Sequence, residues 1–159
     1  MSTGAKADKN KDMKYSLRDS EPKDQAWLES LRREATKELF NLTWGGWDEE
    51  RHQRHFAACL EGGHIQIIEV SGSPVGMLQI FESAEEIEIG EIQISPACQG
   101  QGLGAHVLKD VMERAQKTSK NVVLSAGLKN SGAFKLYKKL GFEETKRSDT
   151  HVHMAYRPK

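Results

Sequence analysis

The sequence predicts one α/β domain, and three observations support this fold class. An apolar run at residues 87–94 is followed by a glycine-rich turn at 95–104 and then by an amphipathic helix, which is the order strand, turn, helix. A short apolar run at 121–125 follows that helix, so the segment forms a right-handed βαβ unit. Two further apolar runs, 64–70 and 75–81, predict a hairpin. At 159 residues, the chain can bury a sizeable core as one domain.

Composition narrows the possible functions. The chain has 23 basic and 23 acidic residues, and this balance argues against a nucleic-acid or membrane-surface binder. No apolar run is long enough to span a membrane, and the first residues lack the apolar segment of a secretion signal. The two cysteines, Cys59 and Cys98, lie far apart, as expected in a reducing cytoplasmic compartment.

The amino-terminal part is expected to hold a leader, a short strand and two helices. Residues 1–12 are small, polar and lysine-rich, so we expect a disordered leader before a domain at 13–159, which starts with a strand at 13–17. A helix begins near Pro22 and ends before the turn at 44–47. Its apolar residues recur at helical spacing: Trp27, Leu28, Leu31, Ala35 and Leu39.

Asp48 is placed to cap the second helix, because its carboxylate can accept from the first free amides. The spacing places three residues on the inner face: Phe56, Cys59 and Leu60. Three others are expected outside: Arg51, His52 and Arg54.

The strand at 87–94 contains a break in its pattern. Ile87 and Ile89 alternate, but the next pair, Ile92 and Ile94, is out of phase with them, and Gly90 lies between the pairs. A glycine together with a phase slip inside a strand indicates a β-bulge.

After the turn, the chain continues with two helices and three strands. The first helix has a core-facing stripe: Leu103, Val107, Leu108, Val111, Met112 and Ala115. Asn130 is expected to cap the second helix, with Gly141 ending it and Phe142 making the apolar contact that follows. The inward residues of the second helix are Ala133, Leu136, Tyr137 and Leu140. Strands at 142–146 and 151–156 end the chain.

The glycine-rich turn is suited to binding a phosphate through the main chain. Its glycines allow a close approach, and the free amides and dipole of the following helix attract anions. The turn lacks the Gly-Lys-Ser/Thr ending of a nucleoside-triphosphate loop. A dinucleotide fingerprint is formally matched by Gly100, Gly102 and Ala105, but no acidic residue occurs from 117 to 142, where that fingerprint requires one.

Two motifs resemble those of the GNAT superfamily of N-acetyltransferases. Gln99-x-x-Gly102-x-Gly104 is similar to its acetyl-coenzyme A loop, and the segment from Asn130 to Phe142 is similar to its Asn-x-x-Ala-x-x-Leu-Tyr-x-x-x-Gly-Phe pattern. The resemblance covers about residues 65–156. It implies a mixed, mostly antiparallel sheet of six to seven strands with a splayed parallel pair, about four flanking helices, and acetyl-CoA as cosubstrate without a metal.

The resemblance also indicates how acetyl-CoA would be held. The turn amides would bind the pyrophosphate, and the strand edge freed by the bulge would pair with the amides of the pantetheine arm. Asn130 either reaches this arm, caps its helix, or does both. The predicted cosubstrate-binding residues are Ile92, Gln93, Ile94, Gln99, Gly100, Gln101, Gly102, Leu103, Gly104, Asn130, Ala133 and Tyr137.

Acetyl transfer to an amine requires two proton transfers. A lysine-type amine has a pKa of about 10.4 and must lose a proton before it attacks, and the leaving thiolate benefits from a proton donor. Tyr137 is the expected donor, although its position also suits a core tyrosine. Glu88 and Glu91 are the candidate bases. Glu88 is preferred because some similar family members carry a glutamate six residues before the position of Ile94; solvent-facing glutamates and a water chain are the alternatives.

The predicted function is therefore transfer of an acetyl group to a primary amine by direct attack in a ternary complex. The alternatives are a non-catalytic acyl-CoA-binding regulatory module and, less well supported, a dinucleotide enzyme. The acceptor is a small-molecule or peptide amine, and monomer and homodimer both stay open. Trp44 and Trp47 either line the acceptor pocket or anchor their loop. Neither histidine pair, 52/55 or 151/153, has a clear third ligand, so no metal site is expected.

Overall fold

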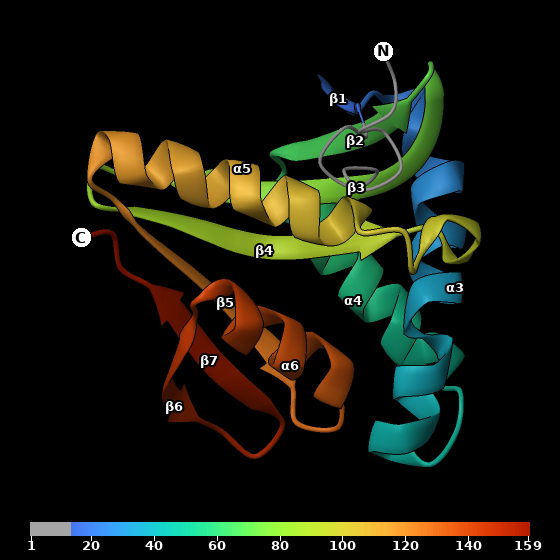
Figure 1. The fold of residues 1–159 in the computed structure, drawn as a ribbon. Helices are drawn as coiled ribbons and strands as arrows, with labels where there is room; N and C mark the ends of the chain where they lie inside the picture. Colours follow the sequence, from blue (N-terminus) through green and yellow to red (C-terminus); the bar gives the residue numbers. More distant parts are fainter. Residues whose placement is uncertain (1–13) are drawn as a thin grey trace.

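The computed structural model describes residues 14–159, which form a seven-stranded mixed sheet with helices on both faces (Figure 1). The predicted leader at 1–12 lies outside the described residues. The strands are β1 (Ser16–Asp19), β2 (Ile65–Val70), β3 (Ser73–Glu82), β4 (Glu86–Ile94), β5 (Asn121–Gly127), β6 (Glu143–Arg147) and β7 (His151–Tyr156). The helices are the 3-10 turns η1 (Pro22–Asp24) and η2 (Pro96–Cys98), and α3 (Gln25–Trp44), α4 (Glu49–Gly62), α5 (Leu103–Thr118) and α6 (Ser131–Leu140).

The sheet separates between its two central strands. Its order is β1-β2-β3-β4-β5-β7-β6, and every neighbouring pair is antiparallel except β4 and β5. These two pair in parallel only where Glu86–Glu88 faces Asn121–Val123. Beyond Glu88, β4 keeps β3 as its partner and β5 keeps β7, so the central strands diverge. The predicted splayed parallel pair is confirmed.

A β-bulge lies where the strands diverge. Gln79 pairs with Glu91 and Ile80 pairs with Ile89, so Gly90 is an extra residue with no partner on β3. The bulge predicted from the phase slip is therefore confirmed. Since Ile87 and Ile89 are buried in the same cluster that Ile92 and Ile94 pack against, the extra residue lets both isoleucine pairs reach the same side of the sheet.

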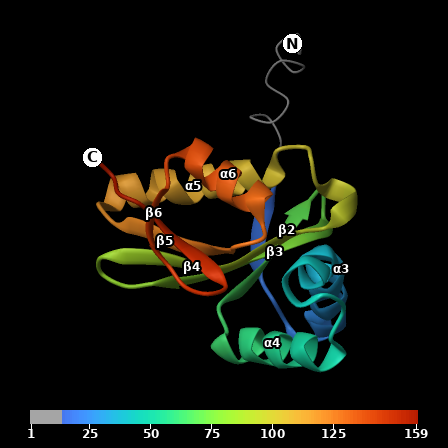
Figure 2. The ribbon, with the colours of Figure 1, turned by 90° about the horizontal axis from the view of Figure 1, so that it is seen from below.

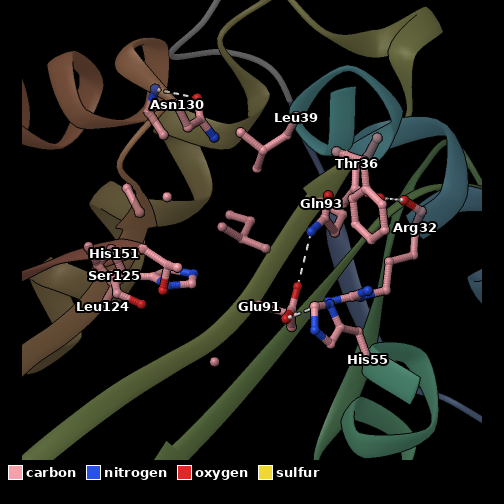
Figure 3. A pocket seen from close by; sticks show the side chains of 18 of the residues that line it. Arg32, Thr36, Leu39, His55, Glu91, Gln93, Leu124, Ser125, Asn130 and His151 are labelled. Carbon is pink, nitrogen blue, oxygen red and sulfur yellow. Dashed lines mark hydrogen bonds and ion pairs between the residues drawn. The ribbon is translucent and has the colours of Figure 1, made fainter. Parts of the chain in front are cut away.

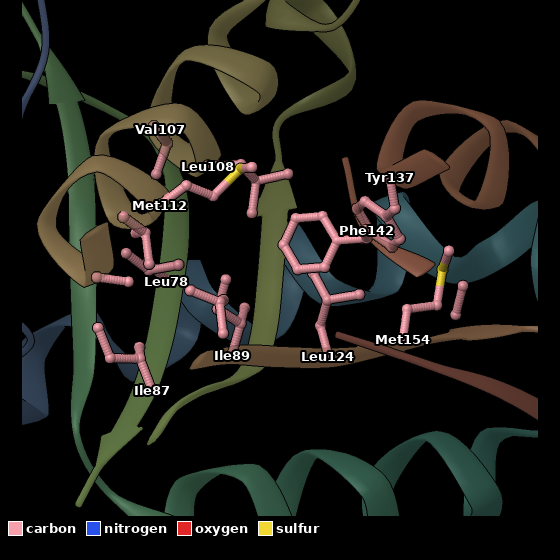
Figure 4. Close-up of a cluster of buried hydrophobic side chains, with 14 of the residues drawn as sticks. Leu78, Ile87, Ile89, Val107, Leu108, Met112, Leu124, Tyr137, Phe142 and Met154 are labelled. Carbon is pink, nitrogen blue, oxygen red and sulfur yellow. The ribbon is translucent and has the colours of Figure 1, made fainter. Parts of the chain in front are cut away.

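The larger core lies between the sheet and the helices α5 and α6, and Figure 2 shows both helices on one face. All six residues of the predicted α5 stripe are buried. In Figure 4, Val107, Leu108 and Met112 of α5 point toward side chains of β3 and β4, while Phe142 lies between them and Met154. Asn130 caps α6 as predicted, since its Oδ1 accepts from the Ala133 amide at 3.1 Å.

The helices α3 and α4 cover the opposite face through a smaller core, which includes Leu28, Leu31, Phe56 and Ile67. Asp48 caps α4 as expected, because its Oδ1 accepts from the Arg51 amide at 3.0 Å.

The prediction that His52 lies outside was wrong. His52 is 0% exposed and belongs to the same helical stripe as Phe56 and Cys59. Its Nε2 lies 2.9 Å from the Glu29 carboxylate of α3, and this partner is 23 residues away in the sequence. A polar side chain can occupy a core position when a partner satisfies it. The first strand also differs from expectation, since it spans Ser16–Asp19 rather than 13–17.

Candidate active site

A cavity of about 470 Å³ opens where β4 and β5 diverge. Its floor and walls come from the β4 segment after the bulge, from the second half of β5 and from the start of α6. Helices α3 and α4 close the remaining side (Figure 3). Figure 3 shows Glu91, Arg32 and His55 on one side of the cavity, with Ser125 and His151 on the other. The splayed sheet therefore creates the cavity, and both helical layers contribute to it.

The edge of β4 that faces the cavity has free main-chain groups. The Ser95 amide donates to the Val75 carbonyl at 2.8 Å. This bond shows which residues of the antiparallel strands β3 and β4 exchange hydrogen bonds. By alternation, the amide and carbonyl of Gln93 face β3, while those of Ile92 and Ile94 face the divergent edge. The expected free edge thus consists of the amide and carbonyl of Ile92 and the amide of Ile94, because the Ile94 carbonyl accepts from Gln99 Nε2. Gln93 contributes its side chain to the cavity wall.

The glycine-rich turn leaves most of its amides unused. Within residues 14–159, the amides from Gly100 to Gly104 donate to no backbone or side-chain acceptor. Gly100 and Gly102 have φ values of 80° and 85°, conformations that suit glycine. This run of residues includes Gln101 and Leu103, which are predicted binding residues with free amides.

Gln99 differs from the other turn residues. Its amide already donates to the Pro96 carbonyl at 3.3 Å, so it offers no free N–H to a phosphate. Its side-chain Nε2 donates to the Ile94 carbonyl at 2.9 Å. Gln99 therefore ties the turn to the end of β4, which holds the free amides beside the free strand edge.

Tyr137 lines the same cavity from α6 and is 8% exposed. Burial raises the pKa of its phenol above the usual 10.0, and the negative charge of Glu91 raises it further. The phenol is consequently protonated at neutral pH, as a proton donor must be. Asn130 and Ala133 line the cavity beside Tyr137, so the structure brings these three predicted residues together.

The two candidate bases lie in different places. Glu88 pairs with Phe81 and Glu91 with Gln79, so the bulge puts both carboxylates on the sheet face that α3 and α4 cover. Glu91 lines the cavity, whereas Glu88 is exposed and lines a second cavity of about 410 Å³. The structure does not bring Glu88 together with Tyr137.

Glu91 is held by two partners. Its carboxylate accepts from Arg32 Nη2 at 3.2 Å and from Gln93 Nε2 at 3.0 Å. Figure 3 shows these three side chains side by side, with the dashed lines meeting at the carboxylate. The contacts fix Glu91 at the cavity wall and leave it surrounded by donors.

Sequence reasoning missed the contribution of α3 and α4 to the cavity. Arg32 and Thr36 line it from α3, and Arg51 and His55 line it from α4. Burial lowers the pKa of the His55 imidazole below its usual 6.5, and the charges of the two arginines lower it further. A signal did exist, because Arg32 and Thr36 continue the four-residue spacing that starts at Leu28, so two polar residues fall on the apolar face.

The two tryptophans of the loop after α3 have different surroundings. Trp44 lines the cavity, and the guanidinium carbon of Arg51 lies 4.3 Å from the centre of its ring. Trp47 stacks on Phe40 at 4.7 Å between ring centres and donates from Nε1 to Glu49 at 2.9 Å. Trp44 therefore belongs to the pocket wall, while Trp47 anchors the loop.

No cluster of three or more His, Cys, Asp or Glu side chains is arranged to hold a metal ion within residues 14–159. None of the helices in this part of the chain is long and apolar enough to cross a membrane.

The sequence was compared with protein-family models and with curated proteins, and both comparisons match N-acetyltransferases. A model of the acetyltransferase (GNAT) family matches residues 26–142. An uncharacterized N-acetyltransferase of Methanocaldococcus jannaschii is 37% identical over 86 residues, which are 49% of this chain and 38% of that protein. The chain thus matches well under half the length of this curated relative.

Solved structures share the fold over nearly the whole chain. The PaiA N-acetyltransferase of Thermoplasma acidophilum, in complex with coenzyme A, is 17% identical with a TM-score of 0.70, over 91% of this chain and 99% of that one. A family member from Elizabethkingia anophelis with acetyl-CoA bound is also 17% identical, with a TM-score of 0.63, over 90% and 97% of the two chains. At these identities the likeness concerns the fold.

Proposed function

Because the chain belongs to the GNAT family of acetyltransferases, we propose that it transfers an acetyl group from acetyl-CoA to a primary amine. The amine attacks the thioester directly while both substrates are bound. One observation carries the proposal: Ile92 of the free β4 edge and the Tyr137 phenol line the cavity where β4 and β5 diverge, and Gln99 ties the turn with its free amides to the end of that edge.

Each part of acetyl-CoA has a matching surface in this chain. The amides from Gly100 to Gly104 would hold the pyrophosphate, since they are unpaired and sit at the amino terminus of α5. The pantetheine arm carries amides of its own, and the amide and carbonyl of Ile92 with the amide of Ile94 offer donor and acceptor groups that an added strand would use. Asn130 and Ala133 lie beside that path on α6.

The proton transfers are assigned to Glu91 and Tyr137. The incoming amine is charged at neutral pH, and Glu91 is the carboxylate of the cavity that takes its proton, directly or through water. We choose Glu91 over Glu88 because Glu88 lies outside this cavity. The leaving thiolate takes a proton from Tyr137, whose raised pKa keeps the phenol protonated. The amide of Ile94 is the donor for the negative charge that develops on the thioester oxygen.

Calorimetric titration with acetyl-CoA, followed by detection of released thiol with a panel of amines, tests the proposal. Micromolar binding and amine-dependent thiol release are expected. Binding without release for any amine would instead favour a non-catalytic acyl-CoA-binding module. No binding at high micromolar acetyl-CoA would refute both functions. Fluorescence of NADH on mixing separates the dinucleotide alternative.

A further inference from the structure

The side of the cavity formed by α3 and α4 contains more positive than negative charge. Arg32 and Arg51 line it, and Glu91 is the one carboxylate among the described lining residues. His55 adds no charge at pH 7, because burial lowers the pKa of its imidazole below the usual 6.5. Asp48 is the nearest acid to Arg51 outside the lining, at 3.9 Å from its Nε, and it is partly exposed. The lining therefore has a surplus of one positive charge.

The arginines also have unused donors. Arg32 has a side chain only 9% exposed, and Nη2 is its contact with Glu91. Its Nε and Nη1 are buried and donate to no described residue, and the same holds for Nε of Arg51. Buried cationic N–H groups without acceptors are unfavourable, and an arginine fork matches carboxylate and phosphate oxygens. An anion would supply acceptors of the kind that these arginines match.

We propose that the amine acceptor carries a carboxylate or phosphate group, which binds to Arg32 and Arg51. This inference rests on the proposed function and specifies its substrate class. The amine of such an acceptor points toward Glu91 and Tyr137, and its anionic end points toward α3 and α4. Arg32 and Glu91 are 3.2 Å apart, so the two polar groups of such an acceptor lie close together. Phe40 and Trp44 provide an apolar surface in the same wall, so an acceptor with an aromatic or aliphatic group beside its two polar groups fits best.

The test compares matched amines in the acetyl-CoA thiol-release assay. Phenylalanine is compared with phenylalaninamide, and phosphoethanolamine with ethanolamine, so the two arms distinguish a carboxylate from a phosphate. For the pair whose anionic group the arginines bind, we expect kcat/KM to be about tenfold or more higher for the amine that carries the carboxylate or phosphate. Equal or better use of both members that lack the anionic group would overturn the inference while leaving the proposed function intact.

Variants show whether the arginines cause the preference. Arg51→Gln is expected to raise KM for the amine with the anionic group about tenfold, with little change for the matched amine that lacks it. Arg54→Gln is the matched control, because Arg54 lies on the same helix with a side chain 60% exposed and outside the cavity. Arg32→Gln should act like Arg51→Gln where circular dichroism shows a folded protein. A preference retained in Arg51→Gln would contradict the assignment.

Calorimetry keeps the inference testable if no amine is acetylated. Each amine is titrated into the protein saturated with acetyl-CoA. Binding of the anionic member alone, lost in Arg51→Gln, supports the inference even when the proposed function fails. Equal binding of both members, or of neither, refutes it.

Discussion

Replacing Gly90 by alanine should destabilise the fold at the bulge. An added Cβ would lie 2.9 Å from Cε2 of Phe81 and 3.0 Å from Oε1 of Gln79, closer than real Cβ contacts allow. Neither neighbour can withdraw freely. Gln79 is buried and donates to the carbonyls of Cys59 and Gly63, both at 2.9 Å. The Phe81 ring packs edge-to-face on His64, at 5.6 Å between ring centres, which restricts its movement on another side.

The expected size follows from a comparison with Gly46→Ala. A Cβ on Gly46 would meet no atom within 4 Å, and its φ lies outside the left-handed range. Both substitutions reduce the entropy of the unfolded chain similarly, so this term cancels. What differs is the overpacking at Gly90, about 1–3 kcal/mol in the free energy of unfolding. For a chain of this size that corresponds to a Tm lower by about 2–12 °C.

Urea denaturation and differential scanning calorimetry of the two variants measure this difference. Acetyl-CoA affinity should fall in Gly90→Ala as well, because the bulge sets where β4 leaves β5. If Gly90→Ala is as stable as Gly46→Ala, then Phe81 and Gln79 yield without cost, and the packing argument for the bulge is wrong.

Three further outcomes are expected. Tyr137→Phe should lower kcat about 100-fold or more while acetyl-CoA affinity stays unchanged, as thiol release and calorimetry will show; an unchanged kcat would remove the phenol from the mechanism. Gly102→Ala and Gly45→Ala both place a Cβ on a residue with positive φ, which costs about 1–2 kcal/mol, but only Gly102→Ala should weaken acetyl-CoA binding. Arg18 holds the pKa of Asp24 at about 2 instead of 3.8, so this carboxylate stabilises the fold above pH 3.8 and loses that effect as the pH falls toward 2. The acid-unfolding curve of Asp24→Asn should therefore lack the loss of stability between these pH values. A curve identical to that of the wild type would contradict this expectation.

Local patterns predicted much of the fold and half of the site. The bulge, the α5 stripe and the cap at Asn130 follow from spacing and residue type, because each depends on neighbours in the sequence. The turn amides were predictable for the same reason. Gln99 was only partly predictable, since its side chain bonds the carbonyl of Ile94 and its amide is used within η2.

The remaining features depend on contacts between distant segments. Glu91 lines the cavity with Tyr137 because the bulge turns it to that face after β4 has left β5, whereas Glu88 lies where the two strands are still paired. His52 is buried where its Nε2 contacts the carboxylate of Glu29 on another helix. Arg32 reaches the cavity because α3 packs against β4 and forms one side of the cavity. No local pattern contains these contacts, although polar residues on an apolar helix face are a usable hint.

The alternation along the end of β4 has a consequence for hydrogen exchange. The amide of Gln93 faces β3 and should exchange slowly with solvent deuterium, while its neighbours Ile92 and Ile94 face the opening and should exchange quickly. Protection would thus change from one residue to the next within a central strand of the sheet. A molecule that completes this edge would slow both neighbours and leave Gln93 as it was.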